Sequence, residues 1–154
     1  MDRTDKEEYI VGCILLLSNK LAQFGDCILP DITFKQWFLL LMVSKMQTEE
    51  KSIHGIAEFT GTSRQNVKKM LAALETKGYV TVCKSTLDAR ALKVELTEKT
   101  YQYFADHAVV AAEETDKLFA DFSLEEIDSL AHKLEKLFNC LALYREKGEY
   151  DEQE

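Results

Sequence analysis

One stretch restricts the fold of this chain more than any other, namely "SIHGIAEFTGTSRQNVKKMLAALETKGY", residues 52–79. A short helix is interrupted at Gly61, and Thr62 or Ser63 can cap a second helix directly after it. Gly78 stops that second helix, because glycine adopts the left-handed conformation at little cost. Two helices joined by so tight a turn must cross closely, and Gly61 is small enough for that crossing. The second helix rests on the first through an apolar stripe made of Val67, Met70, Leu71 and Leu74.

A β-hairpin is predicted immediately after this pair, in "YVTVCKSTLDARALKVEL", residues 79–96. Apolar and polar residues alternate on both arms, as they do in a strand with one buried face. The polar segment 85–90 forms the tip between the two arms. Thr97 can cap a long helix that runs to about Asp121, and Ser123 with Glu126 makes a capping box for a last helix.

Two helices are predicted ahead of residue 52. Apolar residues recur at three-and-four spacing from Tyr9 to Ile28, which indicates an amphipathic helix that ends at Pro30 and Asp31. Thr33 can then cap the segment "TFKQWFLLLMVSKM", which is apolar nearly all round and should be buried on several sides.

Composition excludes several classes of protein. The chain has 154 residues, which suffices for one domain or for one domain with an extension. Its four cysteines are far apart and its three histidines are isolated, so we expect neither a disulfide framework nor a metal site, and no cofactor. The longest apolar run, residues 10–17, is shorter than the roughly 20 residues that cross a bilayer. The sequence therefore predicts a cytoplasmic protein that is not an enzyme and has no membrane partner.

Charge is distributed unevenly along the chain. Residues 62–95 hold seven Lys/Arg and three acidic residues, a net charge of +4, whereas the whole chain carries −8, so the remainder carries −12. A basic segment within an acidic protein indicates one surface that meets a polyanion.

In this order and spacing the segments resemble the MarR family (multiple antibiotic resistance regulators), dimeric winged helix-turn-helix transcription factors. The resemblance rests on "ITFKQW", on the spacing Ala57-x3-Gly61-x5-Val67, on "LETKGYV" and on "LDARALKVELTEK". One departure is Thr100, where the family often has glycine. The resemblance implies a mainly α fold with a small β-hairpin wing, in which a winged helix-turn-helix domain is flanked by N- and C-terminal dimerisation helices.

The resemblance also implies which residues meet DNA. The second helix of the motif would enter the major groove, and the arginine of the wing's Asp-x-Arg would enter the minor groove, oriented by the aspartate. The candidate DNA-binding residues are Ser63, Arg64, Gln65, Asn66, Lys68, Lys69, Asp88 and Arg90. A solvated basic face with an ordinary turn is the alternative interpretation.

Three parts follow from this reading: an N-terminal dimerisation helix (1–31), the DNA-binding domain (32–97), and C-terminal dimerisation helices with an acidic tail (98–154). The expected partners are double-stranded DNA, a second copy of the chain, and a small aromatic or anionic effector near Tyr9, Trp37 and Phe38. A winged-helix protein-interaction module without DNA binding stays an alternative.

A redox-sensing regulator that uses Cys13 is the other alternative. The chain resembles the hydroperoxide-sensing branch of the family in having Cys13 within its first helix. That branch supports the reactive thiolate with a tyrosine at a position where this chain has Phe34, which cannot form a hydrogen bond. We therefore expect Cys13 to be a core residue.

Overall fold

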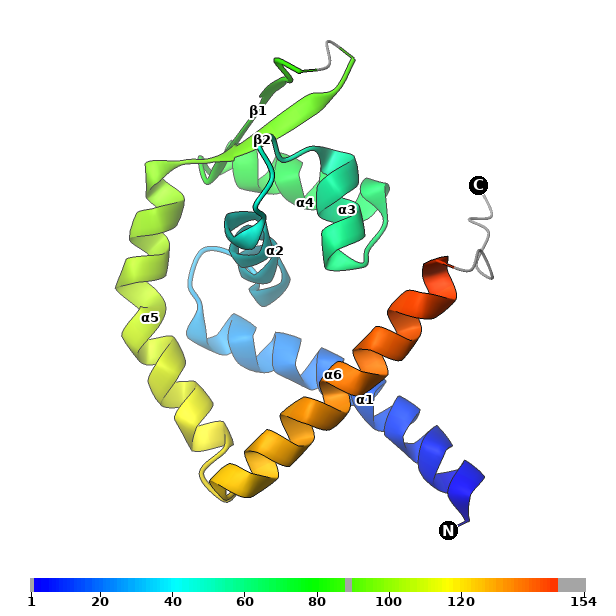
Figure 1. The fold of residues 1–154 in the computed structure, drawn as a ribbon. Helices are drawn as coiled ribbons and strands as arrows, with labels where there is room; N and C mark the ends of the chain where they lie inside the picture. The colour runs from blue at the N-terminus through cyan, green and yellow to red at the C-terminus, as the bar shows by residue number, and fades with distance from the viewer. Residues whose placement is uncertain (1, 88–89, 147–154) are drawn as a thin grey trace. The chain divides into compact units, whose positions relative to one another are not determined.

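The computed structural model describes residues 2–87 and 90–146 of the chain. Its elements are, in chain order, α1 (Arg3–Ile28), α2 (Phe34–Lys45), α3 (Ile53–Thr60), α4 (Arg64–Thr76), β1 (Val80–Lys84), β2 (Leu92–Leu96), α5 (Glu98–Leu118) and α6 (Leu124–Glu146) (Figure 1). The fold is mainly helical with one antiparallel hairpin, so the predicted fold class is confirmed. The chain divides into two compact units, residues 1–111 and 112–154.

Local capping explains where several helices begin. The Thr33 hydroxyl accepts a hydrogen bond of 3.2 Å from the Gln36 amide, and the Gln36 side chain accepts one of 3.0 Å from the Thr33 amide. Ser123 and Glu126 form the predicted reciprocal pair at the start of α6. The prediction for Thr97 is wrong in detail, because its hydroxyl donates back to the Gly78 carbonyl (2.7 Å).

The hydrophobic core lies within the first unit. It joins α2, α3 and α4 to the base of the hairpin and to the start of α5. Apolar residues from distant segments therefore exclude water together, which is the main stabilising contribution in a domain of this size. The buried apolar residues are Leu29, Ile32, Leu39, Leu40, Val43, Met46, Ile56, Ala57, Val67, Leu71, Leu74, Tyr79, Val80, Val94 and Tyr103.

Gly61 is required for its backbone conformation rather than for its size. It caps α3 with φ 68°, in the left-handed region that residues with a Cβ adopt at a cost. A Cβ built on Gly61 would meet nothing within 4 Å, so the expectation of a close helix crossing at this residue is wrong. The turn between α3 and α4 depends on glycine because of φ alone.

Gly25, near the end of α1, lies directly against Phe34 of α2. A Cβ at Gly25 would lie 2.0 Å from Cδ2 of Phe34, a separation that real atoms do not tolerate. Phe34 in turn stacks on Trp37 with ring centroids 5.3 Å apart. The Asp26 carboxylate accepts a hydrogen bond of 2.6 Å from the Phe34 amide. A residue near the end of α1 thus pairs with a backbone amide at the start of α2 that has no partner within its own helix.

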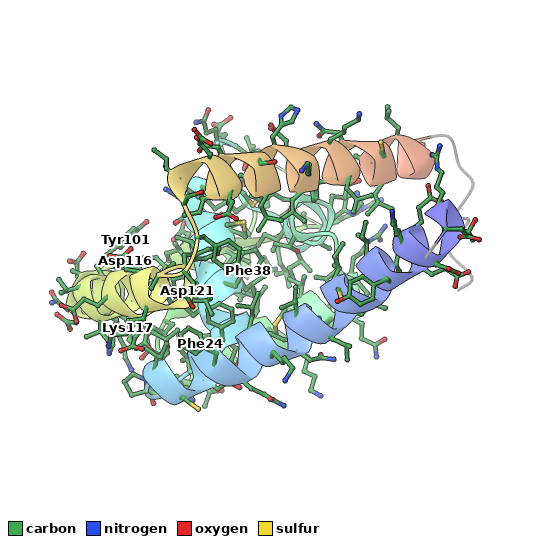
Figure 2. All side chains as sticks on the ribbon, turned by 90° about the horizontal axis from the view of Figure 1, so that it is seen from below. Phe24, Phe38, Tyr101, Asp116, Lys117 and Asp121 are labelled. Atoms are coloured by element: carbon green, nitrogen blue, oxygen red, sulfur yellow. The ribbon has the colours of Figure 1, made fainter. Side chains whose placement is uncertain are left out.

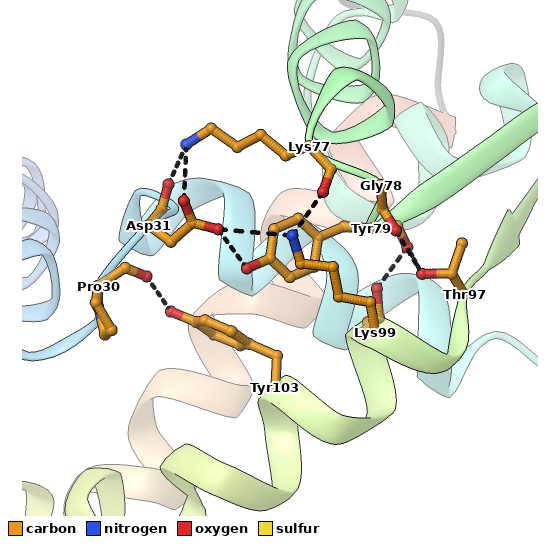
Figure 3. Close-up of polar contacts among 9 residues, drawn as sticks. Pro30, Asp31, Lys77, Gly78, Tyr79, Thr97, Lys99 and Tyr103 are labelled. Atoms are coloured by element: carbon orange, nitrogen blue, oxygen red, sulfur yellow. Dashed lines mark hydrogen bonds and ion pairs between the residues drawn. The ribbon is translucent and has the colours of Figure 1, made fainter.

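A polar cluster connects the α1–α2 turn to the end of α4 and the start of α5 (Figure 3). Its centre is Asp31, a non-glycine residue with φ 72°, whose carboxylate accepts from the Tyr79 hydroxyl and lies 3.8 Å from Nζ of Lys77 and 4.0 Å from Nζ of Lys99. The hydrogen bond from Tyr79 is the main reason that the pKa of Asp31 is lowered. Beside it, the Tyr103 hydroxyl donates to the Pro30 carbonyl (2.6 Å), and burial raises the pKa of Tyr103 to about 12.

Thr100, the departure from the family's glycine, is wholly buried, and its hydroxyl donates to the Tyr79 carbonyl. The side chain thus adds a contact between α5 and the hairpin base where glycine would make none. Its buried hydroxyl is satisfied, so this position accommodates threonine without the cost of an unpaired polar group.

Two helices carry unusually large exposed apolar surfaces. On α1 the exposed apolar residues are Tyr9, Ile10, Val11, Ile14, Leu15, Leu16, Leu17 and Leu21. On α6 they include Leu124, Leu130, Leu134, Phe138, Leu141 and Leu143, and among its residues up to 143 none is buried. Figure 2 shows the side chains along α1 and those along α6.

In the described part of the chain, α1 is also the helix long and apolar enough to cross a membrane by length and composition. The prediction from the run at residues 10–17 considered only uninterrupted apolar residues and missed this. Length and composition are weak evidence, since a helix that buries its apolar surface against protein passes the same test.

Candidate nucleic-acid interface

The first turn of α4 is stabilised by hydrogen bonds among the residues at its own N-terminus. The Ser63 hydroxyl accepts from the Asn66 amide (3.2 Å), and the Asn66 side-chain amide donates to the Thr62 hydroxyl (2.9 Å). Ser63 and Asn66, both predicted as DNA-binding residues, therefore have a local role in the cap. The exposed backbone amides of such a helix start favour an anion, because they lack partners within the helix.

The two faces of α4 differ sharply. Val67, Leu71 and Leu74 are buried against the core, so the orientation of the helix is set by packing. The candidate residues lie on the other side and are exposed to solvent: Ser63, Arg64, Gln65, Asn66, Lys68 and Lys69. They lie outside the buried stripe of α4 and are accessible to a partner, and their contacts with DNA stay a prediction.

The wing is a regular antiparallel hairpin. Its register pairs Val80 with Leu96 at the base and Lys84 with Leu92 at the outer end. Val80 at the base and Val94 in the middle of the hairpin are buried, whereas Leu92 is 44% exposed, so the expected alternation fails at the outer end, which extends beyond the core. Figure 1 shows the hairpin extending past α3 and α4.

The tip carries the second predicted contact. Arg90 is exposed, as an arginine that enters a groove must be. Asp88, its predicted orienting partner, lies outside the described residues. The pairing of these two side chains therefore stays a prediction.

Two acidic residues, Glu75 and Glu50, connect the hairpin to the helices beside it, although their negative charge is unfavourable for DNA binding. Glu75 on α4 accepts a hydrogen bond of 2.8 Å from the Val82 amide, so α4 caps the outer edge of β1. Glu50, in the loop between α2 and α3, accepts from Ser85 and Thr86 at the start of the tip, and these bonds lower its pKa to about 2. Neither residue can be identified from the sequence, because no local pattern distinguishes them from solvated acids.

Some of the basic residues are engaged within the protein. Lys93 lies 2.8 Å from the Glu95 carboxylate and 3.9 Å from that of Glu50, and the bond to Glu95 raises its pKa. Lys77 contacts Asp31 as described above. Of the other basic residues in the segment 62–95, Arg64, Lys68, Lys69, Lys84 and Arg90 are exposed to solvent.

The residues suggested for an effector are not gathered in one environment. Trp37 is half-buried at the edge of the core, whereas Phe38 is 44% exposed and Tyr9 is 64% exposed. Figure 2 labels Phe38 on α2 and Phe24 on α1. The identity and position of an effector stay predictions.

Tyr9 contacts Cys13 one helical turn away. A hydrogen bond to Cys13 is the main reason that the pKa of Tyr9 is raised. Cys13 is only partly covered by its own chain, so the prediction of a core cysteine is not met within one protomer. In the part of the chain that the structure describes, no group of three or more His, Cys, Asp or Glu residues could hold a metal ion.

Comparison with known proteins agrees with this geometry. The sequence model of the MarR family matches residues 31–91, which run from the α1–α2 turn into the wing. Among solved structures, the transcriptional regulator BldR from Sulfolobus solfataricus has a TM-score of 0.77 at 19% identity, with 90% of this chain and 99% of that chain covered.

Two further similar structures contain DNA. A mutant MarR from E. coli complexed with operator DNA has a TM-score of 0.76 at 19% identity, covering 89% of this chain and 99% of that one. The MepR–DNA complex from S. aureus has a TM-score of 0.70 at 21% identity, covering 84% and 94%. At these identities the likeness establishes the shared fold.

Proposed function

This chain belongs to the MarR family of winged-helix transcriptional regulators, and from that premise we propose that it binds a pseudo-palindromic DNA operator as a homodimer and is released by a small ligand. The observation that carries this proposal is the exposed basic face of α4, which lies beside a wing with an exposed arginine. The role is binding rather than catalysis, with α4 in the major groove and Arg90 in the minor groove.

Dimerisation is supported by the apolar surfaces of α1 and α6. A soluble monomer rarely exposes apolar patches as extensive as these, and a second copy of the chain is the simplest partner that would cover them. This also accounts for the hydropathy of α1 without a membrane, in keeping with a cytoplasmic protein. Two α4 helices would then meet half-sites about 10 base pairs apart.

Selection of duplexes from a random DNA pool with the purified protein tests the proposal. The recovered sequences should share a pseudo-palindrome, and the affinity should fall steeply with salt, because each phosphate contact releases counterions. A pool that shows no enrichment and no salt-dependent binding would favour the protein-interaction module instead.

A redox-sensing regulator is the second candidate, and one observation favours it. The tyrosine that Phe34 cannot supply could be replaced by Tyr9, whose hydroxyl bonds to Cys13. Against it, Phe34 occupies a packing position between Gly25 and Trp37 rather than a position beside the thiol. Ligand-controlled release therefore stays the preferred proposal.

A further inference from the structure

The loop between α2 and α3 runs along the wing. The Lys51 carbonyl accepts a hydrogen bond of 2.8 Å from the Val94 amide, and Ser52 forms an isolated antiparallel bridge with Lys93. This loop therefore behaves as a short third strand on the β2 side of the hairpin. Since the loop joins two core helices, it provides a firm base for any side chain that reaches the wing.

One side chain of this loop reaches across to the start of the tip. The Glu50 carboxylate accepts from the Ser85 hydroxyl, from the Thr86 amide (2.9 Å) and from the Thr86 hydroxyl (2.5 Å). The side chain is only 12% exposed. Hydrogen bonds to an ionised carboxylate are stronger than those between neutral groups, so three of them restrain the segment effectively.

The restrained segment leads directly to the predicted DNA contact. Ser85 and Thr86 are the first residues after β1, and the Ser85 hydroxyl accepts a further hydrogen bond of 3.0 Å from the Leu87 amide. The Ser85 amide also donates a hydrogen bond of 3.0 Å to the carbonyl of Ala91, the residue after Arg90, so Ser85 connects the two ends of the tip. Glu50 thus contacts the segment that determines where the tip leaves the hairpin.

We propose that Glu50 is a positioning residue for DNA binding: it holds the start of the wing tip, and through it the place at which Arg90 meets the minor groove. The inference rests on the proposed DNA binding. It assigns a role in that binding to Glu50, whose negative charge by itself repels the phosphate backbone of DNA. An anionic side chain near a phosphate backbone lowers affinity by electrostatics alone. Its contribution must therefore come through the geometry of the tip.

Electrostatics and tip geometry predict opposite effects of removing Glu50 on DNA affinity, so the sign of the change in affinity distinguishes them. Glu49 is the matched control, since it is adjacent, exposed and of equal charge. Affinities of full-length wild type, Glu49→Ala, Glu50→Ala and Glu50→Gln are measured by fluorescence anisotropy on a duplex selected with the wild type. Glu49→Ala should bind equally or more tightly, because a negative charge is removed. Glu50→Ala should bind about five- to tenfold more weakly, which is the lower end of the loss expected on removal of the arginine itself.

Glu50→Gln tests the geometry directly. Its amide oxygen can still accept from Thr86, so its affinity should lie between those of Glu50→Ala and wild type. Hydroxyl-radical footprints should show that Glu50→Ala loses minor-groove protection, while dimethyl sulfate footprints should show that protection of guanine N7 in the major groove by α4 remains. Proportional loss of both footprints would indicate a general structural defect and overturn the positioning role, as would a Glu50→Ala affinity equal to or above that of Glu49→Ala.

A measurement without DNA separates this inference from the proposed function. Amide hydrogen exchange at Thr86 and Leu87 should be faster in Glu50→Ala than in wild type and unchanged in Glu49→Ala. Equal exchange in all three proteins would overturn the anchor whether or not DNA binds. Failure of the wild type to bind any duplex, with exchange as expected, would overturn the function and leave Glu50 as an anchor of the wing alone.

Discussion

The Asp31 carboxylate accepts a hydrogen bond of 2.6 Å from the Tyr79 hydroxyl, joining residues 48 positions apart in the sequence (Figure 3). The bond connects the α1–α2 turn with the residue that begins the wing. Burial and this bond raise the pKa of Tyr79 above its ordinary value, and the same bond lowers the pKa of Asp31. Both shifts make the stability of this junction depend on pH.

We expect Tyr79→Phe to lower the free energy of unfolding by about 1 kcal/mol near neutral pH, the usual contribution of one hydrogen bond. Because the pKa of Asp31 is lowered on folding, its contribution is present above about pH 4 and is lost as pH falls through its folded pKa. Because the pKa of Tyr79 is raised, its contribution is present below about pH 10 and is lost as pH rises further. Thermal unfolding of both proteins between acid and alkaline pH measures this.

The free energy of unfolding of Tyr79→Phe should fall less steeply than that of wild type at both acid and alkaline pH. Tyr103, whose pKa is about 12, keeps part of the alkaline dependence in both proteins. Identical pH profiles for wild type and Tyr79→Phe would contradict the coupling between Asp31 and Tyr79.

Arg90→Ala should weaken specific DNA binding by about 1–3 kcal/mol and reduce the salt slope by about one contact, with little change in melting temperature. The loss follows because an exposed arginine at the tip contributes to binding rather than to the core. Anisotropy titrations at two salt concentrations measure the effect. Lys84→Ala is the control, because Lys84 is exposed on the same hairpin; its loss should cost less and should weaken binding equally on all DNA sequences. Equal affinities for wild type and Arg90→Ala would remove Arg90 from the interface.

Leu134→Glu should give a monomer or an aggregate at micromolar concentration. Leu134 is 47% exposed in the single chain and lies on the apolar stripe of α6, where a charge buried against a second copy would lack a partner. Light scattering coupled to gel filtration measures the mass. His132→Glu places the same charge on another face of the helix and should leave the dimer intact, whereas a monomeric wild type would count against the proposed assembly.

Gly25→Ala should destabilise the protein by about 1–3 kcal/mol, because the added Cβ would collide with the Phe34 ring and separate α1 from α2. Gly12→Ala is the matched control in the same helix, since a Cβ there meets nothing within 4 Å in the chain. Alanine at that half-buried helical position should not lower stability, because it favours the helix over glycine and its Cβ meets open space. Urea unfolding of both variants measures the difference, and equal destabilisation would argue against the close approach at Gly25.

Organic hydroperoxide should leave DNA binding unchanged in both wild type and Cys13→Ser. Phe34 packs against Gly25 and offers no hydroxyl to support a thiolate, and Tyr9 forms a hydrogen bond with Cys13. Binding assays before and after treatment provide the measurement. Release of wild type but not of Cys13→Ser would establish the redox-sensing alternative, and Tyr9→Phe would then show whether the Tyr9 hydroxyl contributes.

Features that depend on neighbouring residues could be predicted from the sequence. The caps at Thr33, Ser63 and Ser123, the glycine turn at Gly61 and the hairpin follow from hydrogen bonds and backbone conformations within a few residues. The apolar stripe of α4 and the opposite exposed basic face follow from helical periodicity in the same way. These local rules predicted the order of the helices and the hairpin and the two faces of α4, and the resemblance to the MarR family then implied the fold class.

Only the tertiary structure could assign Gly25, Asp31, Glu50 and Glu75. Each acts through a partner on another element: Phe34, Tyr79, Thr86 and Val82 respectively. In the sequence, a carboxylate that holds the wing cannot be distinguished from a solvent-exposed carboxylate, because both are isolated charges without periodicity. The distinction depends on which donors the folded chain brings within about 3 Å, and that distance is decided by packing between segments that are remote along the chain.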